Sequence, residues 1–306
     1  MSFEVVDANK NNLVTKSNVL IEANYRLGLV EQKIILCLAS NIQPTDTDFK
    51  IYTLPIKEFN NLLGLEGSPK YTELRKITKD LMKKVFELHI DNKIIQVAWL
   101  SYVAYNKNEG TIDIRFDPFL KPYLLELKRE FTSYKLENVI KLKSAYAIRI
   151  YELLKQYERL HKRVISVNEL RKAIGADEVY PAYGNFKQRI LAPALKEISS
   201  NTDIEFEFEE IKKGRKVDKI KFNITSKKGN LSTKQLSLFD KQLDEFQSVT
   251  YQKARKTALK IGFRLSREQY EKWSTFGSER VQKELEKIVG NKKINNPIGY
   301  INESIS

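Results

Sequence analysis

The chain has 306 residues, of which 42% are hydrophobic, a size that allows two packed cores. Its 53 Lys and Arg outnumber its 39 Asp and Glu and give a formal net charge of +14, which favours a polyanionic partner because Lys and Arg release counterions from phosphates. No apolar run reaches the roughly 20 residues that span a bilayer and the start lacks the layout of a signal peptide, so we expect a cytoplasmic protein without a membrane partner.

The first part of the chain predicts three helices, one strand and two β-rich stretches. Its strongly apolar first helix holds Cys37, the single cysteine of the chain. One cysteine excludes a disulfide framework, and apolar neighbours are typical of a buried thiol. Apolar residues at i, i+3/i+4 spacing mark the helices, alternation marks the β-rich stretches, and Gly64 closes the short middle helix. In chain order these elements cover residues 30–42, 49–56, 56–64, 71–85, 92–105 and 110–116.

The long helix predicted at 71–85 has one apolar and one basic face. Its apolar stripe consists of Tyr71, Leu74, Ile77, Leu81 and Val85. The basic face is rich in lysine and poor in amides, which suits contacts to phosphates more than the reading of bases. A solvated surface is an equally good interpretation. The basic residues are Lys70, Arg75, Lys76, Lys79 and Lys83.

The same order of elements returns in the second part of the chain. Its short helix ends in Ile174-Gly175, and the short helix of the first copy ends in Leu63-Gly64. A tyrosine opens the next helix in each copy, Tyr71 in the first and Tyr183 in the second. The elements of this second copy cover residues 144–157, 163–167, 167–175, 183–198, 202–211 and 217–225. The repeat indicates a duplicated structural unit.

Helix, strand, helix, glycine turn, helix and hairpin is the order of a winged helix. A single copy would also fit a small α+β domain with a helical pair packed on a hairpin, but two copies in register favour the winged helix. We therefore expect an α+β, mainly helical fold with two tandem winged-helix domains and a small helical C-terminal extension. The expected domain bounds are 1–130, 131–226 and 227–306.

The polar face of the predicted helix at 183–198 points to DNA reading. In a helix-turn-helix the second helix enters the major groove, where Arg or Lys can bind guanine and Asn or Gln can bind adenine. The side chains off the apolar stripe include Asn185, Lys187, Gln188 and Arg189. They predict a base-reading face, with a merely solvated face as the alternative.

Pro193 lies inside this same helix. Its ring and missing N–H remove the bond to the carbonyl of Arg189, so we expect a kink or a restart of the helix at that point. The proline would then set the angle at which the first turns approach the groove.

The second predicted hairpin has a basic tip around Gly214. A basic β-turn beside a basic helix suits contacts to phosphates and to the minor groove. The alternative is an edge hairpin that its lysines keep soluble. The basic residues at this tip are Lys212, Lys213, Arg215 and Lys216.

The tail at 227–306 is the most basic part of the chain per residue, with 16 Lys and Arg against 9 Asp and Glu. A polar, lysine-rich linker precedes predicted helices at 266–276 and 278–289, each led by a serine, and Pro297 marks a further helix start. The stretch "NNPIGYINESI" at the end of the tail resembles the ends of replication and helicase-loading proteins. We expect a basic helical module for a protein partner or for DNA, with a disordered extension carrying transient helices as the alternative.

Several motifs resemble the initiator (Rep) proteins of iteron-containing, theta-replicating plasmids. "LKSAYAIRIYELLKQY" resembles the helix that opens the second winged-helix domain of that family, and "FKQRILAPALKEI" with "TDIEFEFEEIKKGRKV" resembles its reading helix and wing. The opening "NLVTKSNVLIEANYRLGLVEQKIILCLAS" is similar to its entry segment, at Asn18, Leu20, Ile21, Ala23, Tyr25, Leu27, Glu31 and Gln32. The resemblance covers residues 12–225.

The resemblance implies a function in plasmid replication. It implies binding to directly repeated sequences in double-stranded origin DNA, opening of the duplex with a host replication initiator, and recruitment of the replicative helicase or its loader. It also implies a dimer that represses its own gene, with the monomer as a candidate active form. The first domain would supply dimerisation and phosphate contacts, and the second would read the sequence.

Enzymatic functions fit the sequence poorly. It holds no G-x-x-x-x-G-K-[ST] loop for a nucleotide, and His89 and His161 form no His-x-His pair for the metal site of a nicking enzyme. We therefore expect no catalytic residue, metal or cofactor. Two alternatives stay open: a plasmid or phage transcriptional regulator, and a rolling-circle nicking enzyme that uses one of the 15 tyrosines as its nucleophile.

Overall fold

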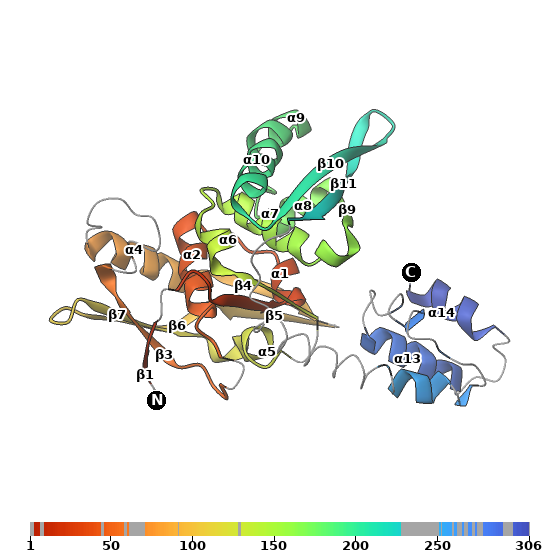
Figure 1. Cartoon of the computed structure of the whole chain (residues 1–306), viewed down its shortest axis with the longest axis horizontal. Helices are drawn as coiled ribbons and strands as arrows, with labels where there is room; N and C mark the ends of the chain where they lie inside the picture. The colour runs from red at the N-terminus through yellow and green to blue at the C-terminus, as the bar shows by residue number, and fades with distance from the viewer. Residues whose placement is uncertain are drawn as a thin grey trace. The chain divides into compact units, whose positions relative to one another are not determined.

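The chain folds into two compact units, Met1–Gly229 and Asn230–Ser306 (Figure 1). Each unit has its own hydrophobic core. The computed structural model describes residues 3–6, 9–43, 46–57, 60, 71–90, 92–127 and 130–227 of the first unit, and residues 251, 253–258, 260–261, 265, 269–270, 273, 278–289 and 296–305 of the second.

The first copy of the repeat is built on a four-stranded sheet with the order β1-β3-β7-β6. β3 pairs antiparallel with β7, β7 forms a hairpin with β6, and β1 adds in parallel to the free edge of β3. Its elements are β1 (Phe3–Val5), β2 (Leu13–Ser17), α1 (Asn18–Glu22), α2 (Leu29–Ala39), β3 (Ile51–Pro55), α4 (Tyr71–Met82), β4 (Val85–Ile90), β5 (Lys93–Ala98), β6 (Leu100–Asn106), β7 (Thr111–Phe116), η1 (Pro118–Leu120) and α5 (Lys121–Leu124).

The long helix of the first copy is shorter than predicted. α4 ends at Met82, and Val85 begins β4 with a side chain that is 58% exposed, so its predicted place in the buried stripe is wrong. β4 and β5 form a separate two-stranded hairpin, whose Phe86 stacks on Trp99 with 4.6 Å between ring centroids. The predicted β-rich stretch at 92–105 therefore divides at Trp99, because its first half pairs back with β4.

The second copy repeats this topology. Its three-stranded sheet has the order β10-β11-β9, and β9 pairs antiparallel with β11 as β3 does with β7. The strand after the first helices thus pairs with the last strand of the hairpin in both copies, as in a winged helix. The elements are β8 (Phe131–Lys135), α6 (Leu136–Ile140), α7 (Ala145–Lys155), η2 (Glu158–Leu160), β9 (Lys162–Ser166), α8 (Val167–Ala173), α9 (Tyr183–Phe186), η3 (Lys187–Leu191), α10 (Ala192–Asn201), β10 (Ile204–Lys213) and β11 (Lys216–Ser226).

The short helix of the second copy has the caps that its sequence predicts. Ser166 accepts a hydrogen bond from the backbone N–H of Glu169, and the carboxylate of Glu169 accepts one from the N–H of Ser166, which is a capping box. Gly175 has a φ of 69°, the left-handed conformation in which a helix commonly ends. Most of the corresponding helix at 56–64, with Gly64, lies outside the described residues.

The two copies share a two-stranded sheet. β2 pairs antiparallel with β8, and the hydroxyls of Thr15 and Ser133 lie 2.9 Å apart at its centre. One continuous core extends through both copies. The predicted boundary at 130/131 falls directly before β8, so the strand that opens the second copy completes a sheet with the first.

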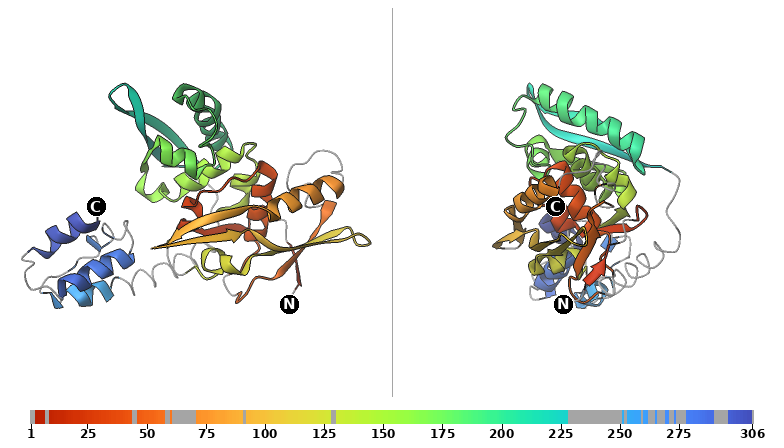
Figure 2. Two further views of the ribbon diagram at one scale, coloured as in Figure 1. Left: turned by 180° about the vertical axis from the view of Figure 1, so that it is seen from behind. Right: turned by 90° about the vertical axis from the view of Figure 1, so that its left-hand side faces the viewer.

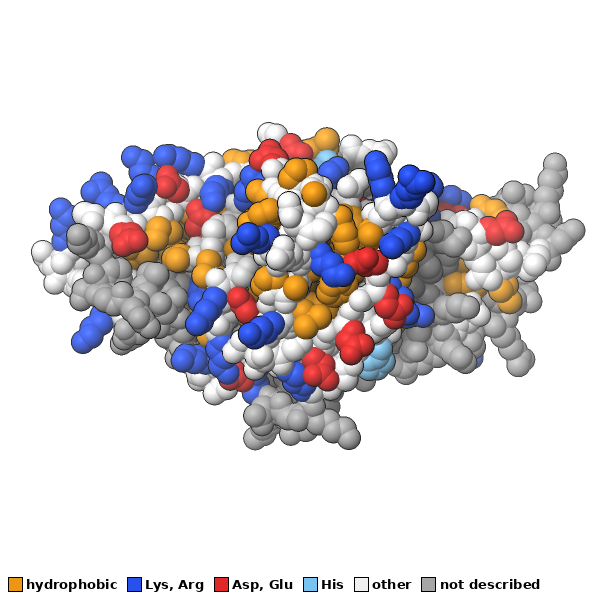
Figure 3. All heavy atoms as spheres, turned by 90° about the horizontal axis from the view of Figure 1, so that it is seen from above, with side chains coloured by type: hydrophobic (Ala, Val, Ile, Leu, Met, Phe, Trp, Pro, Cys, Tyr) orange, Lys and Arg blue, Asp and Glu red, His pale blue; other side chains and the backbone are white. Residues whose placement is uncertain are grey.

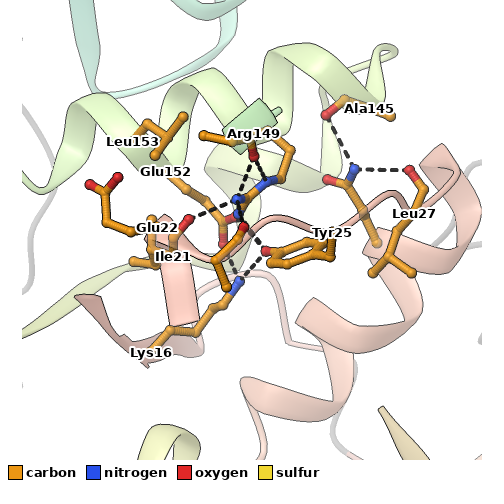
Figure 4. Close-up of polar contacts among 12 residues, drawn as sticks. Lys16, Ile21, Glu22, Tyr25, Leu27, Ala145, Arg149, Glu152 and Leu153 are labelled. Carbon is orange, nitrogen blue, oxygen red and sulfur yellow. Dashed lines mark hydrogen bonds and ion pairs between the residues drawn. The ribbon is translucent and has the colours of Figure 1, made fainter. Parts of the chain in front are cut away.

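A buried polar cluster lies where the copies meet (Figure 4). Arg149 of α7 donates to the carbonyls of Ile21 and Ala173, and it pairs with Glu152 at 3.0 Å. Lys16 of β2 pairs with Glu152 at 2.8 Å. Burial raises the pKa of Glu152, but the charges of Lys16 and Arg149 outweigh burial and lower it overall. The cluster therefore joins β2, α1, α7 and α8 through charged groups that each require their partners.

The second unit is a small helical bundle. The predicted helix at 278–289 is confirmed as α13 (Ser278–Val289), and Pro297 begins α14 (Pro297–Ile305), as expected. Trp273 is buried and donates to Asn302 at 2.7 Å. Most of the predicted linker and of the helix at 266–276 lies outside the described residues. Across the described residues of both units, every helix is too short or too polar to cross a membrane.

Candidate nucleic-acid interface

The predicted reading helix is formed by α9, η3 and α10, which follow one another without a gap. Its core side consists of Phe186, Ile190, Leu191, Ala194 and Ile198, all buried. The four predicted reading residues, Asn185, Lys187, Gln188 and Arg189, are all exposed. The amphipathic pattern of the sequence thus placed these side chains on the solvent side correctly.

Pro193 does not break this helix. η3 is one wide π turn, in which the N–H of Ala192 donates to the carbonyl of Lys187 five residues back. Pro193 is the second residue of α10, and the first turn of a helix tolerates a residue without an N–H. The structure therefore has a widened turn in place of the expected kink or restart. Gln188 and Arg189 are part of this turn.

The turn before the reading helix is fixed by a buried arginine. Arg171 of α8 donates to the carbonyls of Val179 at 2.9 Å and Tyr180 at 2.8 Å, and its guanidinium lies 4.2 Å from the ring centroid of Phe186. Tyr180 has a φ of 50°, which is uncommon for a residue other than glycine. Arg171 thus sets where α9 begins. Sequence reasoning missed this role, because an arginine in the last turn of a helix ordinarily signals only a C-terminal cap.

The first copy also holds this turn in place. A Cβ at Gly175 would lie 3.1 Å from the carbonyl oxygen of Tyr25 and 3.3 Å from the Cα of Arg26, so the backbones touch. Arg26 donates to the carbonyl of Gly175 at 3.0 Å and pairs with Glu178 at 2.8 Å. The segment after α1 therefore packs on the turn that leads into the reading helix of the second copy.

The predicted wing is the β10–β11 hairpin. Gly214 turns it with a φ of 63°, and the pairing register shifts between Ile211 and Lys212, which marks a bulge. The wing tip and the α9 end of the reading helix project at the same end of the unit (Figures 1 and 2). Lys212, Lys213, Arg215 and Lys216 are all exposed. Seen from this end, Lys and Arg side chains spread over the face, with Asp and Glu among them (Figure 3).

Glu210 of the wing strand joins the wing to the reading helix. Its carboxylate accepts hydrogen bonds from Lys187 at 2.7 Å and from the hydroxyl of Tyr183 at 3.1 Å. The hydrogen bond from Lys187 lowers the pKa of Glu210, while burial and the neighbouring carboxylate raise the pKa of Tyr183. Lys187 is therefore exposed but already paired, which the sequence did not indicate.

The basic face predicted for the first copy is present on α4. Leu74, Thr78 and Leu81 are buried on one side, whereas Arg75, Lys76, Lys79 and the following Lys83 are exposed. Lys83 lies 3.4 Å from Asp80. Lys70 and the side chain of Tyr71 lie outside the described residues.

Two family models match the chain. "Initiator Replication protein, WH1" matches residues 13–155 and "Initiator Rep protein, WH2" matches residues 166–224. They confirm the prediction of two tandem winged-helix domains. The first match extends through α7, beyond the predicted boundary at 130/131, which stays a prediction.

Two known replication proteins and one solved structure are similar to the chain. A "Replication initiation protein" of Escherichia coli is 25% identical over 225 residues, which are 69% of each chain. A "PI protein" of Escherichia coli is 29% identical over 190 residues, which are 55% of this chain and 61% of that protein. The crystal structure of Pi initiator protein in complex with iteron DNA matches with a TM-score of 0.61 at 22% identity, over 72% of this chain and 100% of that one. This last likeness establishes a shared fold.

Proposed function

Because the chain belongs to the initiator replication protein (Rep) family, we propose that it binds directly repeated sequences, iterons, in the double-stranded origin DNA of a plasmid and initiates replication there. The observation that carries this proposal is the exposed set of donors on the first turns of the reading helix, beside a basic wing. The relative solved in complex with iteron DNA has the same fold and supports the choice of ligand.

The second copy discriminates among bases. Arg189 and Lys187 offer donors to guanine, and Asn185 and Gln188 offer paired donor and acceptor groups to adenine. The wing residues Lys212, Lys213, Arg215 and Lys216 contact phosphates and the adjacent minor groove, which fixes the orientation of the helix.

The first copy contributes phosphate contacts and dimerisation. The exposed Arg75, Lys76 and Lys79 of α4 carry charge without amides, which suits the backbone of a neighbouring stretch of duplex. The dimer that forms through the first copy represses the gene that encodes this protein, and the monomer is the candidate form that initiates replication.

Bound protein opens the origin together with a host replication initiator and recruits the replicative helicase or its loader. The protein acts in the cytoplasm by binding and assembly, without a catalytic residue, metal or cofactor of its own.

The second unit supplies a basic helical surface for one of these host proteins or for DNA. Its exposed basic residues, around the buried Ala254 and Ala258, are Lys253, Arg255, Lys256 and Lys260.

Footprinting of the purified full chain over the DNA that flanks its gene tests this function. The proposal expects protection of an array of direct repeats, with one protected element per repeat and a preference over bulk DNA. Protection of a lone palindrome in a promoter would instead identify a transcriptional regulator. A covalent 5′-phosphotyrosine adduct on supercoiled plasmid would identify a nicking enzyme. Uniform protection would contradict all sequence-specific functions.

A further inference from the structure

Glu210 occupies an unusual place on the wing strand. β10 alternates between an inner row, Ile204, Phe206 and Phe208, and an outer row of exposed glutamates that includes Glu207. The inner row packs toward α10, and its next member is Glu210, with a side chain that is only 25% exposed. A carboxylate therefore stands where the strand leaves the core and passes beside the reading helix.

The contacts of Glu210 restrain one reading residue. Lys187 lies 2.7 Å from its carboxylate and 5.7 Å from the ring centroid of Phe208, so an ion pair and an aromatic ring together hold the ammonium. Tyr183 donates to the same carboxylate oxygen at 3.1 Å and fixes its position. Lys187 still keeps 47% of its side chain exposed, so it stays accessible to solvent while it is paired.

Such a pair has opposite effects on the two kinds of DNA complex. Binding to an unrelated sequence depends on charge against phosphates, and a nearby carboxylate reduces that attraction. Binding to the correct sequence depends on donors at defined positions, and a lysine that is already held in place loses less side-chain freedom on binding. A group that penalises the wrong partner raises specificity without adding a contact to the right one.

We propose that Glu210 is a specificity-determining residue, which holds Lys187 in one geometry for the groove and withholds its charge from the phosphates of other sequences. This inference rests on the proposed function, in which residues 183–191 read a repeated DNA element. Glu210 itself is a positioning residue, because it acts through Lys187.

The test compares Glu210→Gln with Glu207→Gln in the full chain. Both remove one negative charge from β10, but Glu207 lies on the outer face. The probes are a duplex that the wild type selects from random-sequence oligonucleotides and a shuffled duplex of the same composition, titrated at several salt concentrations. An exposed ion pair is worth about 0.2–1 kcal/mol, so Glu210→Gln should bind the shuffled duplex up to about fivefold more tightly, with a salt slope steeper by up to about 0.9. The selected duplex should bind equally or more weakly, so the ratio of the two affinities falls.

Glu207→Gln should change both affinities by the same small factor, because it alters net charge alone. If Glu210→Gln also changes both by one factor, or weakens both, the inference is overturned. In a Lys187→Ala background, Glu210→Gln should act like Glu207→Gln, and a persistent fall in the ratio would show that Lys187 is not its target. A wild type that selects no preferred duplex would overturn the proposed function as well, whereas a clear selection with an unchanged ratio would overturn this inference alone.

Discussion

Arg189 and Lys213 lie on the two elements that we propose to contact DNA, the reading helix and the wing. Arg189 is exposed on the widened turn of the reading helix, whereas Lys213 is exposed beside the wing turn. A guanidinium can bind the O6 and N7 of guanine at once, so its position carries sequence information. An ammonium at the wing meets phosphates, which are the same in every sequence.

Substitution of these two residues should separate reading from positioning. Arg189→Ala should weaken binding to the selected duplex by about 1–3 kcal/mol and relax the base preference at one position. Lys213→Ala should weaken all duplexes alike and reduce the salt slope by about 1. Affinities measured for the selected and shuffled duplexes over a range of salt check both expectations. Equal loss of selected and shuffled binding on Arg189→Ala would show that the reading helix is assigned wrongly.

The exposure of the four predicted reading residues could be predicted from the sequence, but the partly buried carboxylate that holds Lys187 could not. Helical periodicity alone separates Asn185 and Arg189 from the apolar stripe. Glu210 lies 23 residues from its partner Lys187. The alternation of β10 places Glu210 in the inner row after Phe208, but no local pattern indicates which side chain it meets there. Its role depends on which row of β10 faces the helix, and that is set by the packing of the sheet.

At the scale of elements, the widened turn is the part of the reading helix that its sequence did not specify. Proline leaves one carbonyl of the preceding turn without its usual donor, and a chain can respond with a kink, a restart or a π turn. Phe186 and Ile190 are buried on one side of Pro193, and Ala194 and Ile198 are buried on the other. Because both sides pack on the core, the structure keeps the helix continuous and widens it.

Pro193→Ala tests whether this turn positions the reading residues. The new N–H would permit α-helical spacing in place of the π turn, and this exchange would rotate residues 183–189 by about 100° relative to α10. Because that rotation would take Phe186 out of the core, we expect lower thermal stability, weaker binding to the selected duplex and unchanged binding to the shuffled duplex. An unchanged preference for the selected duplex, together with unchanged stability, would show that the proline does not set the orientation of the reading face.

The order of elements was predictable because each carries a local signal. Gly175, Ser166 and Pro297 lie at the helix ends where capping rules place them. The β4–β5 hairpin was missed for a physical reason: Val85 continues the i, i+4 spacing of α4 although it begins a strand. Spacing alone cannot distinguish the last turn of a helix from the first residue of a strand.

At the scale of the whole molecule, the two copies are less independent than a tandem repeat suggests. The β2–β8 pair joins residues that lie 118 positions apart, and Arg149 binds carbonyls of both copies. Neither contact follows a local sequence pattern, so neither could be predicted from the repeat. We infer that the two copies unfold together, while the second unit, with its own core, unfolds separately.

The two tryptophans of the chain allow this to be measured, because Trp99 lies in the first unit and Trp273 in the second. Phe222→Ala, in the core of the second copy, should cost about 3–5 kcal/mol. In urea unfolding followed by fluorescence, it should lower the midpoint reported by Trp99 in a Trp273→Phe background. The midpoint reported by Trp273 in a Trp99→Phe background should stay in place. A Trp99 transition that ignores Phe222→Ala would mean that the copies unfold independently.

We propose that the first turns of the reading helix lie in the major groove of a repeated element. Gly184 is exposed in α9 with nothing within 4 Å of an added Cβ, and the native Cys37 is fully buried. Gly184→Cys can therefore carry an iron-chelate cleavage reagent in the full chain, with Glu207→Cys on the outer face of the wing as the control.

On the DNA that flanks the gene, Gly184→Cys should cut once within every direct repeat, at positions facing the major groove, and far more strongly than Glu207→Cys. Cutting that is no stronger than that of Glu207→Cys, or that is spread evenly along the duplex, would contradict the account.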